Sequence, residues 1–206
     1  MYTTQLRKHI FFDPLQSDVN QLYIVAGYAT PNMASWLIKN IDCPAGRAID
    51  IRIIVGMVPY DGLSVSIHNG FQELTRETLP ASVNSFSCSY VFNYKAVHSK
   101  LYIWAKDNVP VCAFSGSANF TQTAFSDRRC EMMDSCDPIQ AMNYFHEVER
   151  NSIYCNHAEV EEHIILHPTH AILDRENHPI RPFEPGQIPS VSLSLLTRNG
   201  ETGQRS

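Results

Sequence analysis

The sequence predicts an α/β fold in which a mixed β-sheet carries helices on both faces. Three observations support this prediction. The first part of the chain alternates apolar, strand-like runs with helix-like segments, as parallel β-α-β units do. Four more strand-like runs then follow with short connections between them. An amphipathic helix pattern comes next, and its apolar side is suited to packing on a sheet.

The first strand is expected in an apolar run, and a helix follows it directly. Thr30 is a suitable N-cap for that helix, and Pro31 suits its first turn, where proline needs no amide hydrogen bond. The same order is then repeated, which predicts parallel neighbouring strands. The expected elements are a strand at 21–29, a helix at 30–41, a strand at 48–58 and a helix at 64–79 that Gly70 interrupts.

The next part of the chain predicts the remaining strands and one more helix. Short turn-like stretches separate the strand-like runs. Asp137 is the expected N-cap of the helix. The expected elements are strands at 85–94, 96–106, 109–119 and 128–135 and a helix at 137–152.

Composition limits the possible classes of protein. The chain has 206 residues, 44% hydrophobic and 18% charged, enough for one sizeable core. Its net charge of −5 neither favours nor excludes nucleic acid, so phosphate binding needs a local cationic patch. The six cysteines include no CxxC pair and the N-terminal residues include no signal-peptide run, which favours the cytoplasm. No apolar run has the length of a membrane helix, so no membrane partner is expected.

The amino-acid composition changes near residue 179, where prolines become frequent. Residues 1–178 are expected to form the main domain. Residues 179–190 are rich in proline, which disfavours helices and central strands, and are expected to be a linker. The alternating residues that follow predict that 191–206 begin a truncated second domain; a disordered tail is the alternative.

Four polar residues stand on two neighbouring predicted strands. His98 and Lys100 are two positions apart on one strand, and Ser117 and Asn119 have the same spacing on the next. In an antiparallel hairpin that turns at 107–110, His98 faces Asn119. Lys100 faces Ser117 in the same register. Because side chains alternate between the faces of a strand, all four are expected on one side of the sheet.

This cluster suits a phosphate better than a divalent metal, because it offers hydrogen-bond donors and an imidazole without a carboxylate. Lys100 and Asn119 can hold the non-bridging oxygens of a phosphodiester, and Ser117 can add a donor. His98 is then the candidate nucleophile. A neutral imidazole attacks best when its second nitrogen is held, and Glu131 on the next predicted strand is the candidate for that role.

Two other interpretations of the cluster are weaker. A Ser-His-Asp hydrolase is disfavoured, because no GxSxG turn is present and acyl transfer gives Lys100 no role. The other interpretation is that His98 and Lys100 are only surface residues of an edge strand. The matching positions of Asn119 and Glu131 disfavour it.

Two further groups of residues invite a functional interpretation. Arg128 and Arg129 alternate faces on the predicted strand, so only one of them can reach a phosphate there. His163 and His167 are four positions apart, as zinc ligands on a helix are. Pro168 breaks a helix at that point and no cysteine is close, so no metal site is expected.

At this point the motifs resemble those of the phospholipase D superfamily. His98 and Lys100 resemble its HxK pair, the GSAN stretch that ends at Asn119 resembles its GSxN motif, and Glu131 resembles its trailing glutamate. The order of strands and helices over 20–155 is similar to its fold, which implies a phospholipase-D-like three-layer sandwich.

Two departures from the usual superfamily pattern narrow the resemblance. Ala105 stands where the usual motif has an aspartate, and the nearby Asp107 lies in the predicted turn. The chain also has one copy of the motif, where lipid-cleaving members have two. Both departures are similar to the NgoFVII- and BfiI-type metal-independent restriction endonucleases, in which an N-terminal catalytic domain precedes a DNA-recognition domain.

The resemblance implies hydrolysis of double-stranded DNA without a metal or another cofactor. It also implies a homodimer with the active site on the two-fold axis and a phosphohistidine intermediate. The implied catalytic residues are His98, Lys100, Ser117, Asn119 and Glu131. Two alternatives stay open: a non-specific nuclease or another phospholipase-D-like phosphodiesterase, and a non-catalytic module of the same fold that binds nucleic acid.

Overall fold

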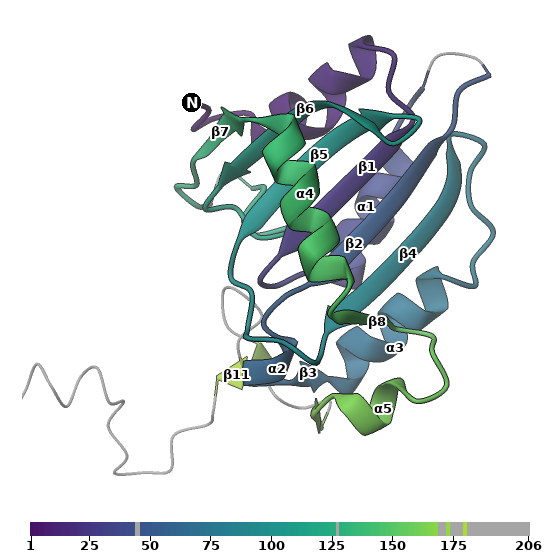
Figure 1. Cartoon of the computed structure of the whole chain (residues 1–206), viewed down its shortest axis with the longest axis vertical. Coiled ribbons are helices and arrows are strands. Elements are labelled where there is room, and N and C mark those ends of the chain that lie inside the picture. The colour runs from purple at the N-terminus through teal and green to yellow at the C-terminus, as the bar shows by residue number, and fades with distance from the viewer. Residues whose placement is uncertain (44–45, 127, 169–171, 174–178, 181–206) are drawn as a thin grey trace, which may run out of the picture.

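The computed structural model describes residues 1–43, 46–126, 128–168, 172–173 and 179–180. Its centre is a seven-stranded sheet in the order β7-β6-β5-β1-β2-β4-β8 (Figure 1). The strands are β1 (Gln21–Ala26), β2 (Ile49–Val55), β4 (Val83–Val91), β5 (Lys100–Lys106), β6 (Val109–Gly116), β7 (Met133–Cys136) and β8 (Ser152–Tyr154).

The sheet is mixed, as the sequence predicts. β1, β2 and β4 run parallel, and the other strands are antiparallel to their neighbours. The Thr30 side chain caps the first long helix by accepting a hydrogen bond from the amide of Met33. Asp137 caps the last one in the same way. The three long helices are α1 (Pro31–Asn40), α3 (Val65–Leu74) and α4 (Pro138–Glu149).

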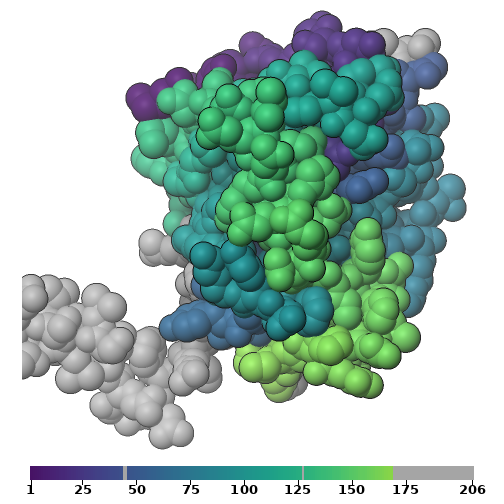
Figure 2. Space-filling view, in the orientation of Figure 1, coloured from purple at the N-terminus to yellow at the C-terminus, as the bar shows by residue number. Residues whose placement is uncertain are grey.

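Helices cover both faces of the sheet. α4 crosses one face (Figure 1), and its side chains cover the centre of that face in the space-filling view (Figure 2). Phe145 of α4 packs there with Tyr23 and Val25 of β1. Leu22 and Ile24 belong to the larger core on the opposite face, where α1 and α3 lie. The predicted α/β fold, with three layers, is confirmed, and this two-sided cover explains why every residue of β1 is buried.

Short elements complete the described part of the chain. They are η1 (Lys8–Phe12), η2 (Asp13–Gln16), α2 (Val58–Asp61), β3 (Leu63–Ser64), α5 (Val160–His163), β9 (Leu166–His167), β10 (Ile172–Leu173) and β11 (Pro179–Ile180). No helix within the described ranges has the length and apolar character needed to cross a membrane.

The predicted linker and second domain fall mainly outside the described residues. β11 consists of the first two residues of the predicted linker at 179–190, and it pairs with β10. The rest of that linker, and all of the predicted domain at 191–206, lie beyond the described ranges. The domain boundaries therefore remain predictions.

The predicted register of the β5–β6 hairpin is wrong by one residue. The hairpin turns at Asp107 and Asn108, which both have a positive φ of 49° and 66°. Aspartate and asparagine tolerate that conformation, so a two-residue turn forms in place of the longer one expected. After a bulge beside Trp104, the pairing places Leu101 opposite Ser115. The predicted pairs His98–Asn119 and Lys100–Ser117 therefore do not form.

The predicted strand at 128–135 is also shorter than expected. β7 begins only at Met133, and the residues from Arg128 to Met132 precede it without regular structure. Glu131 therefore lies in a loop, and strand alternation does not decide between Arg128 and Arg129. In place of regular strand pairing, Ser117 bonds to the Glu131 carboxylate and to the backbone of Met132.

The segment that carries His98 lies against the end of β2. The amide of Val97 donates to the carbonyl oxygen of Gly56 at 2.9 Å. A Cβ on Gly56 would lie 2.0 Å from the carbonyl oxygen of Val97, far inside van der Waals contact. The absence of a side chain at Gly56 therefore lets the chain place His98 beside the sheet.

We expect Gly56→Ala to lower the free energy of unfolding by about 1–3 kcal/mol, because the added methyl group overlaps the Val97 backbone. Urea unfolding followed by circular dichroism measures the change. Asn93→Ala, an exposed position in the same β4–β5 connection, is the control and is expected within about 0.5 kcal/mol of wild type. Equal stability of the two variants would contradict the steric account.

Candidate functional site

The predicted site residues gather at one edge of the sheet. β1 and β2 end at this edge, and β5 begins there, because Ala26 of β1 pairs with Lys100 of the antiparallel β5. His98 lies just before β5, and Asn119 lies just after β6. Ligands of open α/β sheets commonly bind beyond the carboxyl ends of the strands, and this is such an edge.

Gly27, directly after β1, is the point on which His98 and Asn119 converge. A Cβ added to Gly27 would lie 3.0 Å from Cδ2 of His98 and 3.4 Å from Oδ1 of Asn119. The two side chains therefore pack against the same stretch of backbone. They come together here even though the strands that carry them are not in the predicted register.

Lys100 lies next to His98. Its side chain is largely buried, with 7% of the residue exposed. Nζ donates to the backbone carbonyl of His98 at 2.7 Å and lies 3.0 Å from Nε2 and 3.1 Å from Nδ1 of the ring. A neutral imidazole has one unprotonated nitrogen, and only that nitrogen can accept a hydrogen bond from the ammonium.

Tyr28 joins both sides of this cluster. Its backbone amide donates to Oδ1 of Asn119 at 3.0 Å, and its ring packs edge-on against His98 with 5.8 Å between ring centroids. Its hydroxyl donates to Oδ2 of Asp61 at 2.6 Å. The sequence analysis missed Gly27, Tyr28 and Asp61. The position of Gly27 and Tyr28 directly after the first buried strand was the available signal for two of them.

Ser117 and Glu131 form a second contact at this edge. The Ser117 hydroxyl donates to a carboxylate oxygen of Glu131 and accepts from the amide of Met132 at 3.0 Å. The Ser117 amide in turn donates to the carbonyl of Met132 at 2.8 Å. These bonds hold the loop before β7 against the end of β6. In the described contacts, the carboxylate of Glu131 is bonded to Ser117 and not to His98.

Tyr102 supports the backbone between Ser117 and Asn119. It is fully buried, and its hydroxyl donates to the carbonyl of Ala118 at 2.8 Å, between Ser117 and Asn119. Burial raises the pKa of Tyr102 well above its ordinary value, and the negative charge of Glu131 raises it further. Tyr102 is therefore a neutral donor that supports the Ser117–Asn119 turn.

Asp107, Arg128 and Arg129 are the remaining candidate residues, and each lies in a different environment. Asp107 accepts a hydrogen bond from Asn20 at 2.7 Å and lies at the opposite end of β5 from Lys100, so it does not replace the aspartate missing at Ala105. Arg128 is exposed. Arg129 is half-buried, and its Nη2 is buried without a hydrogen-bond partner among the described residues.

The two histidines that suggested a metal site take separate roles. His163 packs on the ring of Phe92, and Nε2 of His167 contacts the carbonyl oxygen of Asp61 at 2.7 Å. Within the part of the chain that the structure describes, no group of three or more His, Cys, Asp or Glu side chains is placed to hold a metal ion.

The comparison with known protein families agrees with the resemblance seen in the sequence. The family described as NgoFVII restriction endonuclease N-terminal PLD domain matches residues 4–162. Among solved structures, NucT from Helicobacter pylori is 18% identical, with a TM-score of 0.48 over 74% of this chain and 96% of that chain. Nuc from Salmonella typhimurium, a phospholipase D family member, is 16% identical, with a TM-score of 0.48 over 71% and 89%.

No curated protein sequence matches the chain. The family match covers most of the described residues and includes all five predicted site residues. The predicted family is confirmed, and the chain is a hydrolase of the phospholipase D nuclease type. It belongs to the NgoFVII restriction endonuclease N-terminal PLD domain family.

Proposed function

We propose that this chain hydrolyses phosphodiester bonds of double-stranded DNA without a metal, as the catalytic domain of a type II restriction endonuclease. The observation that carries the proposal is the convergence of His98 and Asn119 on Gly27, with Lys100 beside His98, at the sheet edge where ligands bind. Membership of the restriction-endonuclease family supports DNA as the substrate.

The chemistry of these side chains supports phosphate binding. An ammonium and an amide supply charged and neutral N–H donors, which suit the non-bridging oxygens of a phosphodiester. The Tyr28 backbone amide donates a hydrogen bond to Oδ1 of Asn119. This bond directs the Nδ2 group of the Asn119 side chain away from Tyr28. Donors that are already in position stabilise the charge that builds up on the phosphate oxygens in the transition state.

His98 is the proposed nucleophile. One nitrogen of its neutral ring attacks phosphorus, and the P–N bond forms as the P–O bond to the leaving oxygen breaks. The leaving oxygen must receive a proton from the opposite side, which the attacking imidazole does not reach. In a symmetric dimer the partner subunit's His98, in its protonated form, supplies that proton.

The second step reverses these roles. Water attacks the phosphohistidine, the P–N bond breaks, and His98 leaves as a neutral imidazole. The partner subunit's His98, neutral after the first step, takes the proton of the water and returns to its starting state. The two imidazoles therefore titrate as a pair, and the negative phosphate between them favours the one proton that they share.

Ser117 and Glu131 have a supporting role in this proposal. The hydrogen bond between them fixes the serine hydroxyl at the turn that carries Asn119. Glu131 thereby acts on the phosphate site through Ser117. The proposed domain plan is that 1–178 cut the DNA, and that 179–190 lead to a recognition domain beginning at 191–206. Such a domain would supply the DNA affinity that a net charge of −5 does not.

We expect plasmid nicking by the purified protein in excess EDTA, because no step of the proposed mechanism uses a metal. His98→Ala is expected to lower the rate by at least about 1,000-fold, since it removes both nucleophile and general acid. Agarose gels measure the rate, and His157→Ala, an exposed histidine remote in sequence from the cluster, is the control. Cleavage that requires magnesium would contradict the mechanism. No cleavage with or without magnesium would favour the non-catalytic alternative.

We expect the active unit to need two intact copies of His98. When wild type and His98→Ala are unfolded together and refolded as a mixture, random pairing makes active dimers vary as the square of the wild-type fraction. An equal mixture should then keep about a quarter of the activity of wild type at the same total concentration. Retention of about half, or a protein that sedimentation shows to be a monomer and that still cuts DNA, would contradict the dimer.

A further inference from the structure

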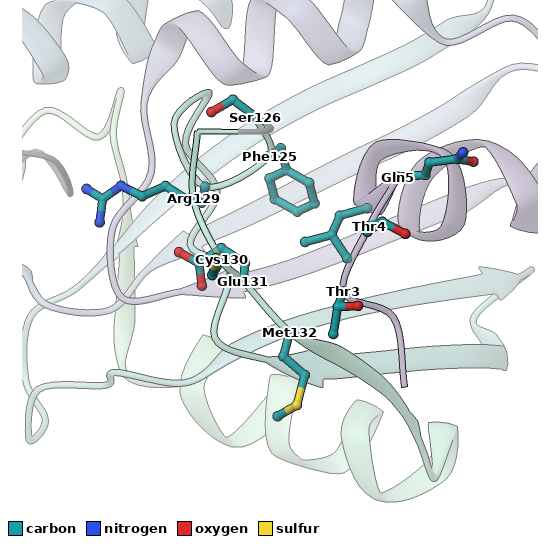
Figure 3. Close-up of a pocket in the computed structure, with 11 residues that line it drawn as sticks. Thr3, Thr4, Gln5, Phe125, Ser126, Arg129, Cys130, Glu131 and Met132 are labelled. Carbon is teal, nitrogen blue, oxygen red and sulfur yellow. The ribbon is translucent and has the colours of Figure 1, made fainter.

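A cavity of about 530 Å³ lies beside the candidate site. It opens between the N-terminal segment and the loop that precedes β7 (Figure 3). The N-terminal wall consists of Thr3, Thr4, Gln5 and Leu6. The loop wall consists of Ala124, Phe125, Ser126, Arg129, Cys130, Glu131 and Met132.

The walls combine apolar and polar groups in the way that nucleotide sites do. Phe125, Ala124 and Leu6 are buried and give the cavity an apolar side. Thr3 and Thr4 are exposed and belong to the opposite wall of the cavity, as Figure 3 shows. An apolar surface of this kind suits the base of a nucleotide, and polar side chains beside it suit the sugar.

The cavity shares Glu131 with the candidate site. Glu131 lines the cavity and also accepts the hydrogen bond from Ser117. In Figure 3 the carboxylate of Glu131 and the guanidinium of Arg129 leave the loop on the same side, away from Thr3 and Thr4. The guanidinium of Arg129 and the carboxylate of Glu131 therefore lie on the same side of the loop.

Arg129 has an unsatisfied donor at this place. Its Nη2 is buried and makes no hydrogen bond to any described residue. A buried guanidinium N–H without an acceptor is unfavourable, because it has lost its water without a replacement. A phosphate oxygen is a strong acceptor for such a group, and guanidinium and phosphate match in geometry.

We infer that this cavity is a subsite for one nucleotide of the cleaved DNA strand, next to the phosphate that is cut, and that Arg129 binds the phosphate of that nucleotide. This inference rests on the proposed function. It separates the roles of the two neighbouring arginines, since Arg128 is exposed and does not line the cavity. Arg129 is a phosphate-binding residue in this account.

Three substitutions test the inference in steady-state cleavage. Arg129→Gln is expected to raise KM for an oligonucleotide duplex roughly tenfold, with kcat nearly unchanged, because one charge-assisted contact to a non-reacting phosphate is lost. Arg128→Gln is the matched control and should leave both parameters within about twofold. Thr4→Trp, which places a large ring in the cavity, should raise KM as Arg129→Gln does.

A binding measurement checks the cavity without relying on turnover. Cys130 lines the cavity and is exposed, while the other five cysteines are buried or half-buried. In the His98→Ala protein, a bound oligonucleotide duplex should slow alkylation of Cys130 by iodoacetamide several-fold, and inorganic phosphate alone should not. Mass spectrometry of the Cys130 peptide gives the rate, and fluorescence anisotropy of the same sample reports how much duplex is bound.

Different results would contradict the nucleotide subsite and the proposed function. If wild type cuts DNA in EDTA but Arg129→Gln behaves like Arg128→Gln, the subsite is wrong and the proposed function stands. Unchanged alkylation of Cys130 in a sample saturated with duplex also overturns the subsite. If wild type does not cut DNA in EDTA, the proposed function itself is wrong.

Discussion

The close approach of two side chains to the backbone at Gly27 is the constraint on which the candidate site depends. The His98 ring and the Asn119 amide both lie within 3.4 Å of the place that a Cβ would take there. Tyr28, the next residue, holds the amide through its backbone N–H and the ring through its edge. The end of β1 therefore sets the distance between the proposed nucleophile and the proposed phosphate ligand, more directly than the pairing of β5 with β6 does.

Hydrogen-bond donors with positive charge are concentrated at the candidate site, although the chain as a whole is acidic. Lys100 is largely buried beside an imidazole, and Arg129 is half-buried beside the same edge. A bound anion stabilises both a buried ammonium and a buried guanidinium nitrogen. The site is thus suited to short-range binding of phosphate, whereas the whole-protein charge contributes little to long-range attraction of DNA.

The sequence predicted the fold well, because its patterns are local. Thr30 and Pro31 mark a helix start through capping chemistry, and the apolar runs of β1 and β2 mark strands covered on both faces. The family followed from the spacing of His98, Lys100 and Asn119. These features depend on neighbours along the chain and need no knowledge of tertiary contacts.

The geometry inside the site was less predictable for physical reasons. The hairpin register depended on whether Asp107 and Asn108 adopt positive φ, which sequence alone does not decide. The role of Glu131 depended on the bonds of Ser117 to the loop before β7, and those are long-range contacts. Tyr28 was missed because it carries no motif, and its importance lies in a backbone amide that every residue but proline has.

The stereochemical course at phosphorus tests the central claim of covalent catalysis by His98 most directly. A duplex with a chiral phosphorothioate at the cleaved bond, cut in EDTA in isotopically labelled water, reports the configuration of the product. Two successive in-line displacements, through a phosphohistidine, each invert the centre and so predict overall retention. Inversion would mean a single direct attack by water, and would contradict the account.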